Sequence, residues 1–486
     1  MNHLYYGDNL DVLREDIDTE SVDLIYLDPP FNSGKDYNVL FKSPSGEDSQ
    51  AQIQAFEDTW HWSSESERFL EQLKFKNGNL AELLDLMVRQ FGRNDLSAYL
   101  VMMAVRLVEL HRVLKPTGSL YLHCDQNASH YLKLILDTVF GINNFRNEII
   151  WHYYNKYSAG KKCFARNYDQ IFFYSKTSSY TFQPLREKRD EPVKQLVREN
   201  VNGVLKNKKD ANGNCIYRIV DDKKVDSVWR IPCLQPASKE MLRYPTQKPL
   251  ALLERIIQAS SNPDDVVLDP FCGCGTAVHA AQKLGRKWIG IDITHLAIGI
   301  IENRLKEAFP DVEYEVHGTP KDLQGAIDLA NRDKYQFQWW ACSLVDAQPY
   351  QGKKKGADGG IDGQIFFTDI EKGKSITKKI IVSVKGGKNI SLTMLKDLIA
   401  TVQGNKAEIG LFITLASPTK PMLKEAASRG FYKAGNGREY PRIQILTIEE
   451  LLNGKLPEYF DAGMGELAFK KSQRETKVIG KQMELF

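Results

Sequence analysis

Residues 266–276, with the sequence Val-Val-Leu-Asp-Pro-Phe-Cys-Gly-Cys-Gly-Thr, decide the fold of this chain. The first four predict a buried strand, and the apolar residues 277–284 predict a helix whose N-terminus faces the loop between them. Gly273 and Gly275 have no side chain, so a ligand can approach the loop backbone closely. A strand, a glycine loop and a helix in this order predict a Rossmann-like sheet that binds a nucleotide-type ligand.

A second acid follows the glycine loop at the spacing that this fold requires. The strand predicted at 288–291 ends at Asp292, which lies 23 residues after Asp269. A carboxylate at that strand tip can accept hydrogen bonds from ribose hydroxyls. The loop is shorter than the GxGxxG fingerprint and has an aspartate before its glycines, which favours a cationic ligand over a pyrophosphate. A generic dinucleotide-binding fold remains the alternative.

A second strand, predicted at 23–27, runs into the tetrapeptide Asp28-Pro29-Pro30-Phe31. The tetrapeptide offers a carboxylate, a carbonyl next to a proline and an aromatic face. These are the groups needed to hold the exocyclic amine of a nucleobase. The alternative is purely structural, because two prolines after an apolar strand also make a rigid strand end.

Four blocks of sequence resemble the DNA amino-methyltransferases, which transfer a methyl group from S-adenosylmethionine to adenine N6 or cytosine N4. The blocks are Tyr6-Gly7-Asp8-Asn9, Asp28-Pro29-Pro30-Phe31, Tyr244-Pro245-Thr246-Gln247-Lys248-Pro249 and the glycine loop. Because the catalytic half precedes the cofactor half, the order is similar to that of the circularly permuted beta class. Methyltransferases of protein glutamine or RNA share a similar tetrapeptide but usually place the cofactor loop first. The resemblance covers residues 1–305.

The resemblance implies an α/β fold, with a Rossmann-like S-adenosylmethionine-dependent methyltransferase domain and an inserted target-recognition region. It also implies a site-specific enzyme that acts on double-stranded DNA. The catalytic residues would be Asp28, Pro29, Pro30 and Phe31. The cofactor-binding residues would be Asp8, Lys248, Asp269, Phe271, Gly273, Gly275, Thr276 and Asp292. In this family an aspartate opens the tetrapeptide mainly in adenine enzymes, so adenine N6 is expected, and cytosine N4 stays open.

The segment between the two halves, residues 151–230, is strongly basic. It has 17 lysine and arginine residues against 9 aspartate and glutamate residues, a net charge of +8 within a chain of +3. Aromatic and basic residues alternate near its start, a mixture suited to base stacking and phosphate contact. These residues are Tyr153, Tyr154, Lys156, Tyr157, Lys161, Lys162, Phe164, Arg166 and Tyr168. We expect a DNA-binding, target-recognition insert, and a solvated loop-rich insert is the alternative.

A histidine lies at the end of another predicted strand. Residues 103–114 have apolar side chains at helical spacing, and residues 119–123 predict a buried strand. His123 and Asp125 at its end are a candidate catalytic pair. Methyl transfer to an amine has no obvious need of a general base, so we expect a structural role for His123.

Residues 334–450 resemble the PD-(D/E)xK nuclease core, especially Mrr-like restriction endonucleases, which implies a second α/β domain. Asp362 precedes the predicted strand 379–385, which contains Ser383 and Lys385, and Asp358 is a further candidate ligand of Mg²⁺. Ser383 stands where the nuclease motif has Glu or Gln, which leaves the metal with few carboxylates. A nuclease-derived DNA-binding domain is therefore expected, and a Mg²⁺-dependent nuclease within a fused restriction-modification enzyme stays open.

Composition fits a large enzyme of about three domains, with 486 residues of which 42% are hydrophobic. The predicted division is a methyltransferase domain (1–150 and 231–318), the insert (151–230), a nuclease-like domain (319–455) and a tail (456–486). Seven scattered cysteines, the absence of a leading apolar segment and the lack of a membrane-length apolar run predict a cytoplasmic protein outside the membrane. Cys272 and Cys274 are expected to pack rather than to bind zinc. The oligomeric state stays open, with a homodimer as one option.

Overall fold

The structure is a computed structural model of the full chain. It describes residues 1–30, 37–42, 48–56, 61–156, 162–201, 203–235, 237–242, 244, 246–350, 360–371, 374–462 and 475; for 37–42 and 48–56 it describes the backbone alone. Among the residues discussed above, Phe31, Tyr157, Lys161, Pro245 and Asp358 therefore lie outside the described residues.

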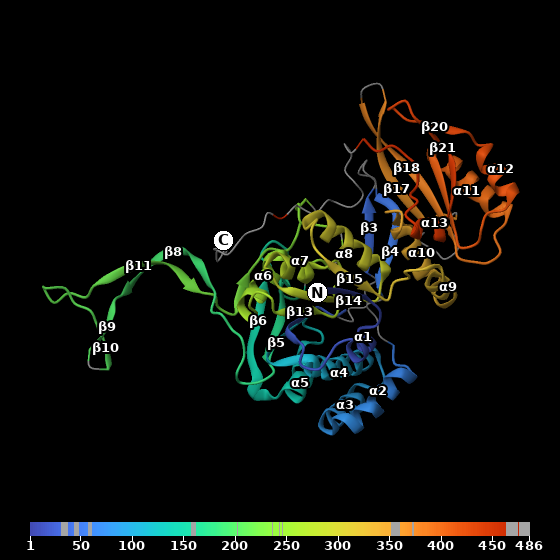
Figure 1. The fold of residues 1–486 in the computed structure, drawn as a ribbon. Coiled ribbons are helices and arrows are strands. Elements are labelled where there is room, and N and C mark those ends of the chain that lie inside the picture. Colours follow the sequence, from blue (N-terminus) through green and yellow to red (C-terminus); the bar gives the residue numbers. More distant parts are fainter. Residues whose placement is uncertain are drawn as a thin grey trace.

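A nine-stranded sheet forms the centre of the described N-terminal two thirds of the chain (Figure 1). Its strands, in spatial order, are β12 (Val228–Arg230), β6 (Phe145–His152), β7 (Tyr168–Ser175), β5 (Leu114–Cys124), β2 (Val22–Leu27), β13 (Val266–Asp269), β14 (Lys287–Asp292), β1 (Asn2–Tyr6) and β15 (Tyr314–His317). The strands from β5 to β15 pair in parallel, whereas β7 runs antiparallel to both β5 and β6. The predicted Rossmann-like fold is confirmed.

Helices cover both faces of this sheet, as a parallel sheet requires. Alternate residues of β2 show the two faces: Ile25 belongs to one apolar core and Leu24 to the other. The first core is closed by α1 (Asn9–Glu15), α4 (Asp95–Val113) and α5 (Ser129–Phe140), with α2 (Ser64–Lys76) and α3 (Gly78–Phe91) outside them. The second is closed by α6 (Leu250–Ser260), α7 (Thr276–Lys283) and α8 (His295–Ala308). The 3-10 turn η1 (Ile142–Asn144) precedes β6.

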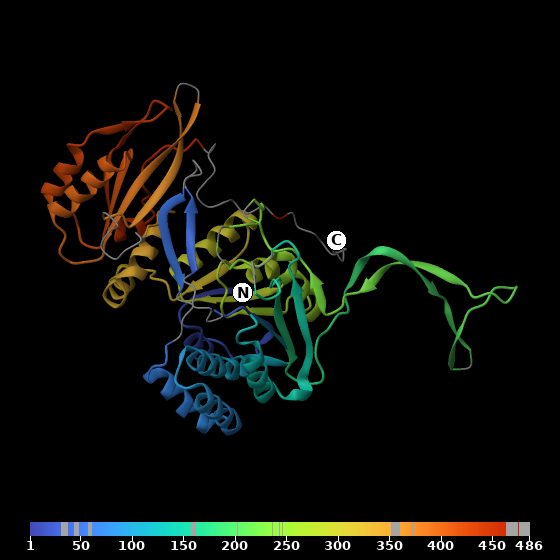
Figure 2. The same ribbon diagram turned by 180° about the vertical axis from the view of Figure 1, so that it is seen from behind.

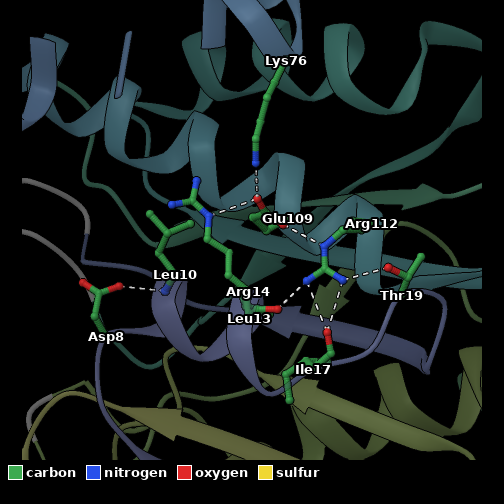
Figure 3. A network of polar contacts seen from close by, with 9 residues as sticks. All are labelled: Asp8, Leu10, Leu13, Arg14, Ile17, Thr19, Lys76, Glu109 and Arg112. Carbon is green, nitrogen blue, oxygen red and sulfur yellow. Dashed lines mark hydrogen bonds and ion pairs between the residues drawn. The ribbon is translucent and has the colours of Figure 1, made fainter. Parts of the chain in front are cut away.

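A buried carboxylate fixes α1 and α2 to α4 (Figure 3). Glu109 on α4 accepts hydrogen bonds from Arg112 at 2.8 Å and from both Arg14 and Lys76 at 3.1 Å. Burial acts to raise the pKa of Glu109, and the three cationic donors outweigh it and hold that pKa below its ordinary value. The network positions α1, whose N-cap Asp8 lies at the site described below.

The basic insert is divided between the sheet and a projecting arm. Strands β8 (Arg186–Leu196) and β11 (Tyr217–Lys224) form an antiparallel ribbon, continued by the hairpin β9 (Arg198–Val201) and β10 (Val204–Asn207). Both ribbon views show this arm extending away from the sheet (Figures 1 and 2). The predicted insert, 151–230, contains both this arm and two strands of the central sheet, because β7 and β12 pair with β5 and β6.

The C-terminal region begins with two helices, α9 (Leu323–Arg332) and α10 (Lys334–Ser343). Its described residues form a five-stranded sheet in the order β16 (Gln348–Pro349), β17 (Gly363–Glu371), β18 (Lys374–Lys385), β19 (Ile409–Thr414) and β22 (Ile443–Thr447). Helices α11 (Leu392–Gly404), α12 (Lys420–Ala427) and α13 (Ile448–Leu452) accompany it. A small antiparallel pair, β20 (Phe431–Lys433) with β21 (Glu439–Pro441), also belongs to this region. A further antiparallel pair, β3 (Tyr37–Lys42) with β4 (Asp48–Phe56), comes from the N-terminal part of the chain. The predicted α/β character of this region is confirmed. Among the described helices, none combines the length and the apolar character needed to cross a bilayer.

Candidate active site

A cavity of about 690 Å³ opens at the carboxyl ends of β1, β2, β13 and β14. Parallel strands place their carboxyl ends at one edge of a sheet, so segments distant in sequence meet there. The cavity is lined by these residues that the sequence singles out: Asp8, Asp28, Pro29, Pro30, Lys248, Asp269, Phe271, Gly273, Thr276 and Asp292. The described residues of the predicted catalytic tetrapeptide and residues of the predicted cofactor loop therefore line one common space.

Asp28 follows β2 and has two differently placed carboxylate oxygens. The Lys248 ammonium donates to Oδ2 in an ion pair that is largely buried, with 12% of the Lys248 side chain and 14% of the Asp28 side chain exposed. Oδ1 is buried and has no hydrogen-bond partner among the residues that the structure describes. An unsatisfied buried acceptor costs free energy, and a ligand donor that enters the cavity can satisfy it.

Asp292, at the tip of β14, orients the glycine loop. Its Oδ2 accepts from the backbone N–H of Gly273 at 3.0 Å, and its Oδ1 accepts from the N–H and the hydroxyl of Thr294, both at 2.9 Å. Burial raises the pKa of Asp292 to about 6. Each carboxylate oxygen has two lone pairs, so the group retains acceptor capacity toward the cavity.

Asp269 adds a third carboxylate at the same sheet edge. It accepts from the N–H of Phe271 at 3.1 Å and is 4% exposed. Burial raises the pKa of Asp269 well above its ordinary value; the N–H of Phe271 opposes this, and the carboxylates of Asp28 and Asp292 add to it. A carboxylate whose pKa is raised by neighbouring carboxylates is stabilised in its ionised form by a nearby cation. The charge pattern thus favours a cationic ligand.

The two glycines of the loop have different roles. Gly273 lines the cavity with φ at +49°, and a Cβ there would lie 3.1 Å from the Tyr244 ring. Gly275 caps α7 with φ at +73° and does not belong to the cavity lining, and a Cβ there would lie 2.7 Å from Ile301 on α8. Gly275 thus serves the packing of α7 against α8, and its predicted contact with a ligand stays a prediction.

Asp8 is held by a residue that the sequence did not reveal. Arg106, on α4, is 4% exposed and donates to both carboxylate oxygens of Asp8 at 2.9 Å. It also donates to Asn9, whose amide in turn donates to the Pro270 carbonyl at 2.7 Å. An arginine inside the otherwise apolar stretch 98–108 of this helix is the signal that could have identified Arg106.

His123 lies behind the cavity, fully buried. It contacts the Tyr26 hydroxyl through Nδ1 and Asp169 through Nε2, each at 3.1 Å, and Tyr26 lines the cavity. Asp125 caps the next turn by accepting from the N–H of Asn127 at 2.9 Å. His123 therefore supports a cavity residue from behind.

The aromatic residues of the basic insert are unequally accessible. Phe164 is 98% exposed, and Tyr154 is exposed beside the guanidinium of Arg230. Tyr153 instead directs its hydroxyl to the carbonyl of Tyr168 at 3.3 Å. Of the predicted stacking residues that the structure describes, Phe164 and Tyr154 are thus the most open to a nucleic acid.

The C-terminal region has its own polar cluster, centred on Asp362. Oδ2 of Asp362 accepts from the Val384 N–H at 2.6 Å, the Ser383 hydroxyl at 3.2 Å and the Lys385 ammonium at 3.4 Å. Oδ1 accepts from the amide of Gln338 at 3.0 Å. Burial raises the pKa of Asp362, and Lys385 opposes this. The structure thus brings the predicted Asp362, Ser383 and Lys385 together.

Helix α10 also reaches the first cavity. Asp333, Tyr335, Gln336 and Trp339 contribute to its lining. The sequence assigned these residues to the second domain, and nothing in their local pattern indicated a place at the first site.

Comparison with known proteins gives two family matches. A family model described as DNA methylase matches residues 22–303, and one described as NACHT-associated inactive Restriction Endonuclease 1 matches residues 343–453. The chain is similar to the DNA adenine methyltransferase YhdJ of Escherichia coli K12, at 29% identity over 68% of this chain and 91% of that protein. It is also similar to the type II methyltransferase M.HpaI of Haemophilus parainfluenzae, at 27% identity over 64% of this chain and 78% of that protein. Among solved structures, the PvuII DNA methyltransferase (cytosine-N4-specific) aligns at 15% identity and a TM-score of 0.37, over 64% of this chain and 89% of that one.

The DNA methylase match spans more than half of the chain and includes the tetrapeptide, the glycine loop and Asp292. All three border one cavity at the carboxyl edge of the parallel sheet. The chain therefore belongs to the DNA methylase family and is a DNA methyltransferase.

Proposed function

We propose that this DNA methyltransferase transfers a methyl group from S-adenosylmethionine to the N6 amine of adenine in double-stranded DNA. The observation that carries the proposal is the buried Oδ1 of Asp28, which has no hydrogen-bond partner among the described residues although Asp28 itself lines the cavity. An exocyclic amine is a donor that satisfies this acceptor. Two further facts favour adenine: the tetrapeptide opens with aspartate, and the relative YhdJ is an adenine methyltransferase by name.

The cavity suits S-adenosylmethionine in shape and in charge. Asp292 is placed to hold the ribose hydroxyls, and its carboxylate with those of Asp28 and Asp269 favours a sulfonium cation. Phe271, Gly273 and Thr276 border the part of the cavity proposed for the methionine end. Asp8 adds a further carboxylate, held by Arg106. When bound, the cofactor supplies an electrophilic methyl group.

The residues of the chain have to present the amine. An adenine must leave the base stack to enter this cavity, at a cost of a few kcal/mol. Asp28 Oδ1 and the Pro29 carbonyl would accept the two amine hydrogens and draw the nitrogen lone pair out of the ring system. Phe31, which lies outside the described residues, would stack on the base. Lys248 keeps the second oxygen of Asp28 occupied, so Oδ1 is the oxygen left for the substrate.

In this proposal Lys248 acts on the catalytic side of the cavity. The resemblance placed it among the cofactor-binding residues, and its ion pair with Asp28 supports a role in orienting the carboxylate. Lysine and arginine residues of the projecting arm would contact the DNA backbone, and the exposed Phe164 and Tyr154 would add stacking surfaces.

Cytosine N4 is the alternative target, because its amine presents two hydrogens to the same acceptors. The deciding experiment incubates the purified protein with unmethylated DNA and S-adenosylmethionine, and then identifies the modified nucleosides by mass spectrometry. N6-methyldeoxyadenosine supports the proposal. Detection of N4-methyldeoxycytidine overturns the choice of adenine. If the DNA stays unmodified, the proposed methyl transfer from S-adenosylmethionine to DNA is overturned. Long-read sequencing of the same DNA then gives the recognition sequence.

For the C-terminal domain we propose DNA binding without cleavage. Both oxygens of Asp362 already accept from donors of the protein, and Ser383 offers a neutral hydroxyl where a metal site needs a second acid. Lys385 would contact a phosphate. The alternative, a Mg²⁺-dependent nuclease, predicts cutting of unmethylated DNA that is lost in Lys385→Ala. The proposal predicts intact DNA with and without Mg²⁺, and weaker DNA binding in that variant.

A further inference from the structure

Helix α10 turns one face toward the methyltransferase cavity. Tyr335, Gln336 and Trp339 lie at positions i, i+1 and i+4, which share one side of a helix, and all three line the cavity. We call these three residues the α10 face. Asp333 precedes them, caps the helix by accepting from the N–H of Tyr335 at 2.9 Å, and borders the same space.

The opposite side of α10 is anchored in the C-terminal domain. Phe337, Trp340 and Ala341 are buried in the core formed with α9 and the C-terminal sheet. Gln338, on the same helix, donates to Asp362. The α10 face is therefore presented to the cavity by a rigid part of the second domain.

Two contacts fix the α10 face against the methyltransferase domain. Gln336 accepts from the backbone N–H of His295 at the start of α8, at 3.3 Å. Trp339 packs on an apolar cluster that includes Tyr244 and also Cys274 of the glycine loop. Helix α10 also packs along α8. The cavity wall at this side thus depends on residues of both domains.

A third connection runs through Tyr6, which borders the cavity at the end of β1. Tyr6 stacks on His295 with ring centroids 3.6 Å apart. Burial raises the pKa of Tyr6 to about 12, while Arg332, at the end of α9, lowers it through its charge and a hydrogen bond. Arg332 directly precedes Asp333 and α10, so the junction of α9 and α10 is tied to the cavity as well.

We propose that the α10 face is the binding surface for the purine of the cofactor, so that cofactor affinity depends on the C-terminal domain. This rests on the proposed function above, in which Asp292 holds the ribose. Ile293, next to Asp292, is 56% exposed and borders the cavity together with Tyr335 and Trp339. A purine attached to that ribose extends toward apolar and aromatic surfaces, and aromatic side chains bind purines by stacking.

The test measures binding of S-adenosylhomocysteine to the full chain by isothermal titration calorimetry. The variants are Trp339→Ala, Tyr335→Ala and the conservative Trp339→Phe, and circular dichroism checks that each is folded. Phe431→Ala is the matched control, because Phe431 is an exposed aromatic residue of the same domain that does not line the cavity. Stacking on one ring contributes about 1–3 kcal/mol, so Trp339→Ala should raise Kd by about tenfold or more. Tyr335→Ala should raise Kd severalfold, Trp339→Phe should restore most of the affinity, and Phe431→Ala should leave Kd unchanged.

The outcomes separate this inference from the function on which it rests. If the wild-type chain does not bind S-adenosylhomocysteine, the proposed function fails. If the wild type binds and both alanine variants bind with the same Kd, the role of the α10 face is overturned while the proposed function stands. Tyr335 is 49% exposed, so we expect Tyr335→Ala to fold. If Trp339→Ala fails to fold, the Kd of Tyr335→Ala decides whether the α10 face binds the cofactor. Slower hydrogen exchange of α10 amides on addition of S-adenosylhomocysteine is the second expected result, and unchanged exchange contradicts the inference.

Discussion

Lys248 and Asp28, 220 residues apart in sequence, form an ion pair at the floor of the cavity. The contact joins the half of the domain that carries the tetrapeptide to the half that carries the glycine loop. It also distinguishes the two oxygens of Asp28. Oδ2 accepts a hydrogen bond from Lys248, whereas Oδ1 has no hydrogen-bond partner among the described residues. In the proposed mechanism Oδ1 is the acceptor for the substrate amine, and the ion pair with Lys248 orients it.

Replacement of Lys248 by methionine should strongly reduce methyl transfer. The change leaves the Asp28 carboxylate without its buried counter-ion, so the carboxylate is no longer held in the direction that the substrate amine requires. We expect the initial rate of tritiated-methyl incorporation into DNA to fall at least about 100-fold, which corresponds to about 2.7 kcal/mol of lost transition-state stabilisation. Lys248→Arg, which keeps the charge, should retain more activity than Lys248→Met. Equal rates for wild type and Lys248→Met contradict an orienting role.

Cofactor affinity should fall as the solution becomes acidic. The pKa of Asp292 is about 6 because of its burial, so the group is ionised above that pH and gains a proton below it. The ionised form is the better acceptor for ribose hydroxyls and the better partner for a cation. The Kd for S-adenosylmethionine should therefore rise between pH 7.5 and pH 5. Asp292→Asn should bind more weakly and lose most of this pH dependence, and a wild-type Kd that is flat across this range is inconsistent with the assigned role.

Gly275→Ala should destabilise the fold through packing as well as through backbone strain. Its φ is +73° and the new Cβ would lie 2.7 Å from Ile301. Gly285 is the matched control, because its φ is +72° and a Cβ there meets no atom of the described residues within 4 Å. At both positions the alanine must adopt a left-handed backbone conformation, which destabilises the fold by about 1–2 kcal/mol. Thermal unfolding should therefore give a lower Tm for Gly275→Ala than for Gly285→Ala, and equal Tm values contradict the packing role.

Strand-tip acids were predictable from sequence because local signals define them. Asp28, Asp269 and Asp292 each end a short apolar run, and parallel strands bring their carboxyl ends to one edge. The role of Gly275 was not predictable, since both glycines of the loop have the same local pattern and only the position of Ile301 separates them. The chemical roles of the three acids remain predictions until variants at these positions are measured.

Features that depend on long-range packing were missed. The sequence does not indicate that β7, inside the predicted insert, pairs with β5 and β6, because strand pairing is set by long-range packing. The α10 face was assigned only to the second domain, because its place at the cavity depends on how that domain packs against α8. Arg106 was not identified because its partner Asp8 is 98 residues away in sequence.

The most direct test of a single shared site is methyl transfer by Asp28→Ala, measured together with its affinity for S-adenosylhomocysteine. In the proposed mechanism Asp28 supplies the acceptor for the amine, whereas the glycine loop and Asp292 hold the cofactor. The account predicts no detectable methyl incorporation into DNA and a Kd within about threefold of wild type, since the lost contact belongs to the substrate side. Methylation by Asp28→Ala at a rate close to that of the wild type would contradict it.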